Sequence, residues 1–80
     1  MKYEFCWELI TEGKHQLVNG EENLYSLVVN KNVLYPLDIP IRLYSQKGGA
    51  VKGTVLIKEL IIRKEYTEIL YRLLSLNTVN

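Results

Sequence analysis

Hydrophobic and polar residues alternate along most of the chain, and a period of two is typical of β-strands rather than helices. In the first segment, the odd-numbered residues from Tyr3 to Leu9 are aromatic or aliphatic, and the even-numbered residues are mostly charged. This pattern predicts a half-buried strand whose core face carries four side chains: Tyr3, Phe5, Trp7 and Leu9. Glu12-Gly13-Lys14 then predicts a turn, and residues 15–19 predict a short return strand.

The middle of the chain predicts two further strands. Residues 24–29 form the first of them. Residues 33–44 alternate most clearly, and their buried row would contain Val33, Tyr35, Leu37, Ile39, Ile41 and Leu43. Pro36 and Pro40 interrupt this segment, and neither can donate a backbone hydrogen bond inside a central strand. The residues between the prolines therefore predict an edge, a bend or a crossing between two strands.

The C-terminal third predicts a β-hairpin. Residues 54–63 are rich in β-branched side chains, which favour a strand, whereas residues 66–76 fit a strand or a helix. A strand is favoured because one register, with Arg63 opposite Glu68, aligns aliphatic pairs and opposite charges. Its further pairs are Ile61 with Leu70, Glu59 with Arg72, Ile57 with Leu74 and Val55 with Leu76. Both hairpin faces are largely apolar, so we expect the hairpin to curl into a barrel or to pack against another subunit.

Together, these elements predict an all-β, mainly antiparallel fold: a small curled sheet or partly open barrel of five to seven strands. The 80 residues suffice for a single domain over 1–80. One cysteine, Cys6, excludes an intramolecular disulfide, and Cys6 with His15 offers too few ligands for a metal. A dense core or self-association must therefore supply the stability of this small domain.

Composition narrows the classes of function. Ten basic and nine acidic residues give a formal net charge of +1, which disfavours DNA binding, because a DNA-binding protein carries a clearly basic face. No run approaches the roughly 18 apolar residues of a membrane span, and the first residues lack the apolar region of a signal peptide. With a free thiol and no export signal, we expect a cytoplasmic protein without a membrane partner.

Three segments resemble a known family: Glu22-Asn23-Leu24-Tyr25, Leu34-Tyr35-Pro36-Leu37-Asp38-Ile39-Pro40 and Tyr71-Arg72-Leu73-Leu74-Ser75-Leu76-Asn77. From about residue 10 to its end, the chain resembles the bacterial domain-of-unknown-function family 2584, which occurs in Bacillus-like organisms. The resemblance implies a cytoplasmic protein with strands in both C-terminal segments, and it implies no activity. The fold is similar to PUA-like small barrels, which often hold RNA, although a fold alone does not assign a function.

No residue pattern predicts catalysis, a metal site or a cofactor. Cys6 lies between Glu4 and Glu8, and nearby carboxylates raise the pKa of a thiol, which argues against a Cys6–His15 nucleophile pair. Asp38, between the prolines, either fixes the bend by accepting backbone hydrogen bonds or contacts a ligand, and the structural role is favoured. We therefore expect a protein that is not an enzyme.

The best candidate binding chemistry lies in residues 45–53, where three glycines and two lysines predict a mobile basic loop. The candidate nucleic-acid contacts are Arg42, Tyr44, Lys47 and Lys52, because cations pair with phosphates and tyrosine stacks on bases. Two hypotheses follow. The first is a protein-interaction or self-association module, supported by the apolar hairpin, the balanced charge and six tyrosines. The second is an RNA-binding PUA-like barrel that uses the basic loop.

Overall fold

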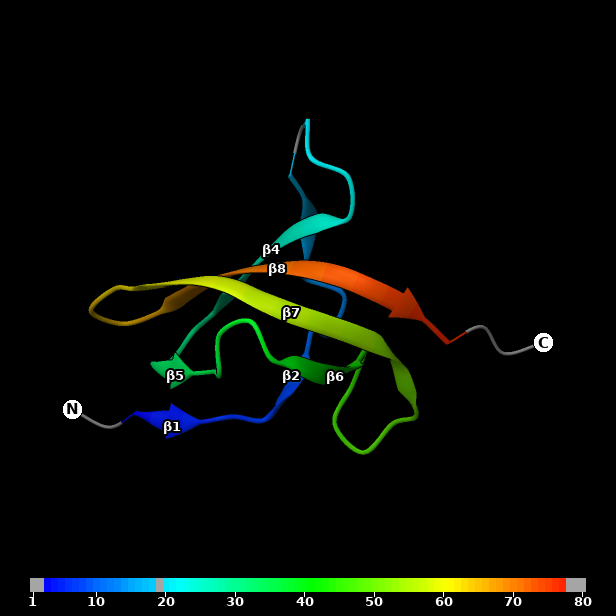
Figure 1. The fold of residues 1–80 in the computed structure, drawn as a ribbon. Helices are drawn as coiled ribbons and strands as arrows, with labels where there is room; N and C mark the ends of the chain where they lie inside the picture. Colours follow the sequence, from blue (N-terminus) through cyan, green and yellow to red (C-terminus); the bar gives the residue numbers. More distant parts are fainter. Residues whose placement is uncertain (1–2, 19, 78–80) are drawn as a thin grey trace.

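The computed structural model describes residues 3–18 and 20–77, and within them the chain forms strands and no helix (Figure 1). This finding confirms the all-β class. The strands are β1 (Glu4–Phe5), β2 (Glu8–Ile10), β3 (Gln16–Leu17), β4 (Leu24–Val29), β5 (Val33–Leu34), β6 (Pro40–Tyr44), β7 (Val51–Ile62) and β8 (Thr67–Leu76). β3 is the predicted return strand, and Asn19, the last residue of that prediction, lies outside the described residues.

Six strands form one curled sheet in the order β2-β6-β7-β8-β4-β3, and β1 pairs with β5 in a separate two-stranded sheet. The pairs β3–β4, β4–β8, β6–β7 and β7–β8 are antiparallel, whereas β2–β6 and β1–β5 are parallel. Among the described strands, β2 and β3 end the large sheet and do not pair with each other, so the sheet is not closed. The predicted small, mainly antiparallel, curled sheet of five to seven strands is confirmed.

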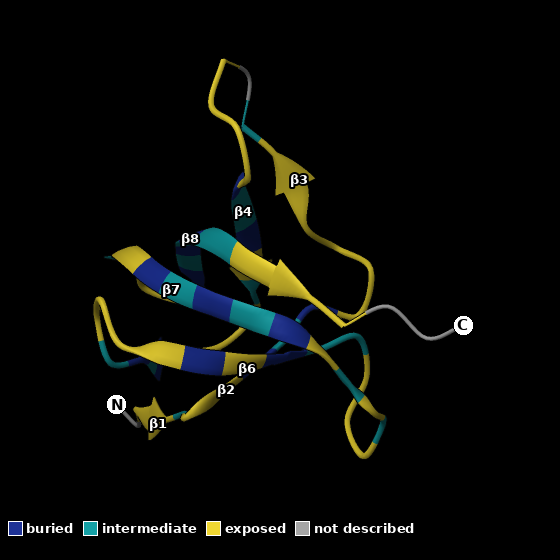
Figure 2. Ribbon diagram, turned by 45° about the vertical axis from the view of Figure 1, so that its right-hand side comes forward, coloured by how far each residue is buried: buried dark blue, intermediate teal, exposed yellow. Residues whose placement is uncertain are grey.

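The core lies on one face of the curled sheet, where alternate residues of the long strands point inward. Ile41 and Leu43 of β6 follow the predicted alternation. Val55 and Ile57 of β7 are buried as well, and Figure 2 shows buried and less buried residues alternating along β7. The core cluster contains Leu9, Leu27, Val33, Tyr35, Ile41, Leu43, Val55, Ile57, Ile69 and Tyr71. The inward row of β6 was therefore predictable from the period of two, whereas both faces of the β7 sequence are largely apolar.

The predicted core face of the first segment is wrong. Leu9 is buried, but Tyr3, Phe5 and Trp7 are exposed, and Cys6 packs against the core instead. The chain bends at Trp7, between β1 and β2. Because β1 pairs with β5 and β2 pairs with β6, the two strands belong to different sheets. A bend between strands exchanges the inward and outward rows, which a straight strand would keep.

The second departure from simple alternation lies between the two prolines. Leu37 and Ile39 are both 51% exposed, although the pattern predicts that they are buried. Asp38 between them has a φ of 56°, a left-handed conformation that Asp tolerates better than most residues. This residue produces the predicted bend. Its Oδ1 accepts a hydrogen bond from Lys58 Nζ at 2.7 Å, so Asp38 has a structural contact, although with a lysine rather than with backbone N–H groups.

β7 and β8 form the predicted hairpin, but its predicted register is wrong. Ile62 pairs with Thr67, and the Arg63 N–H donates to the Tyr66 carbonyl at 2.9 Å. In the same register Ile61 pairs with Glu68 and Glu59 with Leu70. One shift then gives Ile57 with Tyr71 and Val55 with Leu73, and a second shift follows between Val55 and Thr54. Opposed charges contribute only about 0.2–1 kcal/mol per pair. Burial of Ile57 and Tyr71, each worth about 1.5–3 kcal/mol for an apolar side chain of this size, outweighs them.

Candidate interaction surface

The three cations among the predicted nucleic-acid contacts, Arg42, Lys47 and Lys52, line different surface hollows. Lys52 lies on β7, which begins at Val51, rather than in a loop. The fourth contact, Tyr44, is half-buried at the end of β6. RNA contact at these residues stays a prediction. A different part of the surface, around Phe5 and Trp7, carries exposed aromatic side chains.

Two aromatic rings lie on the outside of the N-terminal strands. The ring centroids of Phe5 and Trp7 are 4.9 Å apart, and their planes are tilted by 53°. The two residues are 54% and 64% exposed. Burial of aromatic side chains is strongly favourable, so a solvent-exposed aromatic pair is a candidate contact surface for a binding partner.

Trp7 also borders an open hollow of about 450 Å³. Ile39 and Pro40 line this hollow from the bend and the start of β6, and Arg42 lines it from β6. We call Phe5, Trp7, Ile39, Pro40 and Arg42 the Trp7 surface. Glu8 lines the same hollow and is the strand partner of Arg42, so the surface carries both signs of charge.

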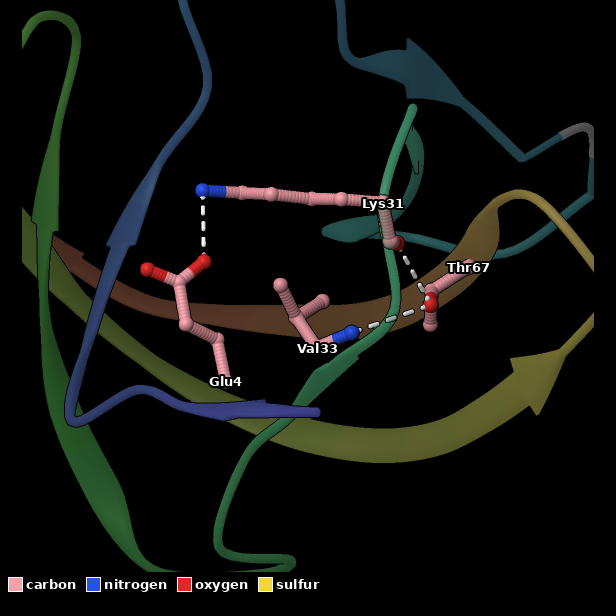
Figure 3. A network of polar contacts seen from close by, with 4 residues as sticks. All are labelled: Glu4, Lys31, Val33 and Thr67. Carbon is pink, nitrogen blue, oxygen red and sulfur yellow. Dashed lines mark hydrogen bonds and ion pairs between the residues drawn. The ribbon is translucent and has the colours of Figure 1, made fainter. Parts of the chain in front are cut away.

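Ion pairs and hydrogen bonds hold the backbone around this surface. Lys31 Nζ lies 2.7 Å from Glu4 Oε2, and the Glu4 N–H donates to the Asn32 carbonyl at 3.1 Å. Figure 3 shows Lys31 reaching across to Glu4 above Val33. The hydrogen bond from Lys31 and its charge hold the pKa of the Glu4 carboxyl below its ordinary value. β1, which carries Phe5, is therefore tied to the segment that leads into β5.

The two residues that the sequence offered for catalysis, Cys6 and His15, make different contacts. Burial raises the pKa of the Cys6 thiol and also that of the Tyr35 hydroxyl, with which Cys6 forms a hydrogen bond. His15 instead packs edge-on against Tyr25, with ring centroids 5.5 Å apart. Among residues 3–18 and 20–77, no three His, Cys, Asp or Glu side chains gather into a metal site. The same part of the chain has no helix of the length and hydropathy that crosses a membrane.

The Trp7 surface was missed from the sequence because alternation placed Phe5 and Trp7 inside. The identity of Cys6 was the sequence feature from which this surface could have been predicted. Cysteine is among the residue types most often buried, whereas tryptophan is seldom fully buried. Had Cys6 been placed inside, the even-numbered residue would have faced the core, and both aromatic rings would have faced outward.

Comparison with known proteins agrees with this fold. The family model "Domain of unknown function (DUF2584)" matches residues 1–80. Over 80 residues, the chain is 34% identical to "Uncharacterized protein YtmB" of Bacillus subtilis (strain 168), which covers 100% of this chain and 98% of that protein. The X-ray crystal structure of protein ytmB from Bacillus subtilis is similar, with a TM-score of 0.88 and 32% identity over 100% of this chain and 96% of that chain. The chain therefore belongs to the DUF2584 family, as its tyrosine- and proline-containing segments indicated.

Proposed function

We propose that this protein is a non-enzymatic, cytoplasmic interaction module that associates with a second copy of itself through the Trp7 surface. The observation that carries the proposal is the 64% exposure of Trp7, beside a second exposed aromatic ring and an open hollow that Ile39 and Pro40 also line. Trp and Arg are enriched among the residues that dominate the binding energy of protein interfaces. Trp7 and Arg42 line the same hollow.

Self-association is favoured by the charges at this surface. The net charge of +1 creates little repulsion between two copies. In a two-fold dimer both subunits contribute the same patch, so the patch must be complementary to itself in shape and charge. Glu8 and Arg42 provide a carboxylate and a guanidinium side by side, and Arg42 forms no ion pair with any described residue.

The contact area extends beyond the aromatic pair. Pro40 is exposed at the start of β6, and its strand partner on β7 is the half-buried Leu56. Stable protein contacts bury about 800 Å² on each partner, and an apolar centre surrounded by polar groups is their usual arrangement. The Trp7 surface and its neighbours on β7 have that arrangement.

The proposal is tested by light scattering across a dilution series. We expect the wild-type chain to dimerise and Trp7→Ser to weaken dimerisation by about tenfold or more, because a buried tryptophan is a strong contact. Leu17→Ser is the matched control, because Leu17 is 60% exposed on β3 and lies outside the Trp7 surface. A wild-type chain that stays monomeric at every concentration would contradict self-association. An equal effect of both substitutions would contradict a contact through the Trp7 surface.

RNA binding by a PUA-like barrel is the alternative, and the structure gives it less support. Lys47 shares its hollow with Lys14 and Lys31 but also with Glu8 and Glu12, so the positive charge there is partly balanced. If the alternative holds, affinity for mixed-sequence RNA falls steeply with salt, and Lys47→Glu with Lys52→Glu abolishes binding without changing the melting temperature. Under our proposal, no such salt-dependent binding is detected.

A further inference from the structure

A separate hollow lies among β4, β6, β7, β8 and the segment between β2 and β3, and it has a volume of about 290 Å³. Three of its lining residues are aromatic. Tyr25 and Tyr71 are strand partners in the β4–β8 pair, and their rings are stacked with centroids 5.6 Å apart and planes 18° from parallel. His15 meets the Tyr25 ring edge-on. We call this site the aromatic hollow.

The aromatic hollow combines apolar walls with a few polar groups, as small-molecule sites do. Leu43 and Leu73 contribute apolar surface, and Ser45 and Lys52 contribute a hydroxyl and an ammonium. Tyr71 is only 2% exposed. Burial raises the pKa of its hydroxyl above the ordinary value of 10.0. The volume lies at the lower limit for ligand pockets, about 300 Å³, which suits a single ring system rather than a large cofactor.

Charge distinguishes this hollow from the other two. Among its described lining residues are Lys52 and His15, and none is Asp or Glu. By contrast, Glu8 lines both the hollow of Lys47 and that of Trp7. Lys52 also forms no ion pair with a described residue. Its cation is therefore available to a ligand, and an anionic ligand group is favoured there.

We propose that the aromatic hollow binds a small planar aromatic ring that carries one anionic group. The ring packs against Tyr25 and His15, because aromatic rings attract one another in stacked and edge-on arrangements. The anionic group pairs with Lys52. This inference is independent of self-association, because none of the residues that it uses belongs to the Trp7 surface.

The test is an NMR titration of the full chain with indole-3-acetate, which carries a ring and a carboxylate. Neutral indole and acetate are titrated in parallel to separate the two contributions. We expect chemical-shift changes at His15, Tyr25 and Tyr71, and Lys52→Gln should weaken indole-3-acetate binding by about tenfold while leaving the affinity for indole unchanged. Lys47→Gln, a change of an exposed lysine outside this hollow, should have no effect.

Three results would overturn the proposal: no shift at the aromatic hollow, shifts confined to the Trp7 surface, or equal losses from Lys52→Gln and Lys47→Gln. Equal losses would indicate general attraction between an anion and a lysine-bearing surface. Lys52 is exposed on β7, so its substitution should leave the melting temperature unchanged. Tyr25→Leu adds a second measurement, because removing the half-buried ring should weaken both indole and indole-3-acetate.

Discussion

At the scale of single residues, Thr67 joins two parts of the chain that no sequence pattern connects. It is 0% exposed, and its Oγ1 donates to the Lys31 carbonyl at 2.9 Å and accepts from the Val33 N–H at 3.2 Å (Figure 3). One hydroxyl thus satisfies two backbone groups that lead into β5. Alternation predicts only whether such a residue faces inward, not which backbone groups it meets.

Replacement of the Thr67 hydroxyl by a methyl group should lower the free energy of unfolding, although the side chain keeps its shape. Thr67→Val keeps the volume but leaves a buried donor and acceptor without a partner, so we expect a loss of about 1–3 kcal/mol in the free energy of unfolding. Thr67→Ser is the control, because it keeps the hydroxyl and loses only a methyl group. Urea unfolding measures both variants. A valine variant as stable as the serine variant would contradict the role of the hydrogen bonds.

Gly53 is required by a close approach of two strands. It is buried on β7, and a Cβ atom at this position would collide with the Ser75 carbonyl of β8. We expect Gly53→Ala to lower the free energy of unfolding by about 1–3 kcal/mol, as other overpacked sites do. The neighbouring Lys52→Ala should change it by less than about 0.5 kcal/mol. Thermal unfolding of the two variants tests this, and equal melting temperatures would refute the steric role of Gly53.

Cys6 should react slowly because its environment favours the protonated thiol. Burial, followed by the charge of Glu4, raises the pKa of Cys6 above its ordinary value of 9.0. A raised pKa leaves less thiolate at any given pH, and the thiolate is the nucleophile. Alkylation by iodoacetamide at pH 8 should therefore be slower in the folded protein than after unfolding in urea. Equal rates in the two states would show that the thiol is neither buried nor shifted.

At the scale of elements, the long strands and the short return strand β3 were predictable, whereas β1 and β2 were predicted as one strand. β4, β6, β7 and β8 extend over five or more residues each, so their period of two is visible in the sequence. β1 and β2 are short and belong to different sheets, and the bend between them at Trp7 reverses the buried row. The hairpin register failed at the turn itself, because Ile61 already pairs with Glu68 rather than with Leu70 before the first bulge.

The same limit explains why the candidate surface was not found from the pattern. Phe5, Trp7 and Ile39 are hydrophobic, and a pattern argument places such residues inside. Each lies at or beside a bend in the chain, at Trp7 or at Asp38. The alternation rule, which identified the core residues correctly, thus assigned these exposed apolar residues to the interior. The cations of the predicted RNA site were identified as exposed, but their separation into different hollows depends on how the sheet curls.

β1 itself should respond to acid through the Glu4–Lys31 pair. The pKa of Glu4 is lowered in the folded protein. The ion pair therefore stabilises the fold fully at pH values above the ordinary pKa of 4.5, and this stabilisation is lost as the pH falls through the lowered pKa. Amide hydrogen exchange of Glu4 and Cys6, which donate to Asn32 and Leu34, should speed up there relative to core amides. In Lys31→Met the additional pH dependence should be absent, and its persistence would assign the effect to another group.

At the scale of the whole molecule, the large sheet ends at β2 and β3 without closing. Its core nevertheless contains buried residues from the end strand β2 and from β4, which lies next to the other end, such as Leu9 and Leu27. A small domain buries a modest fraction of its surface, and this one leaves its single tryptophan outside. Self-association would cover that ring and add the apolar burial that the monomer lacks.

Because Trp7 is the only tryptophan in the chain, its fluorescence reports on the Trp7 surface alone. The most direct measurement is the emission wavelength of the wild-type protein over a dilution series, with the fraction of dimer measured by light scattering in the same samples. We predict emission typical of a water-exposed indole at low concentration and a shift to shorter wavelength that follows dimer formation. Dimerisation without any change in emission would contradict a contact through Trp7.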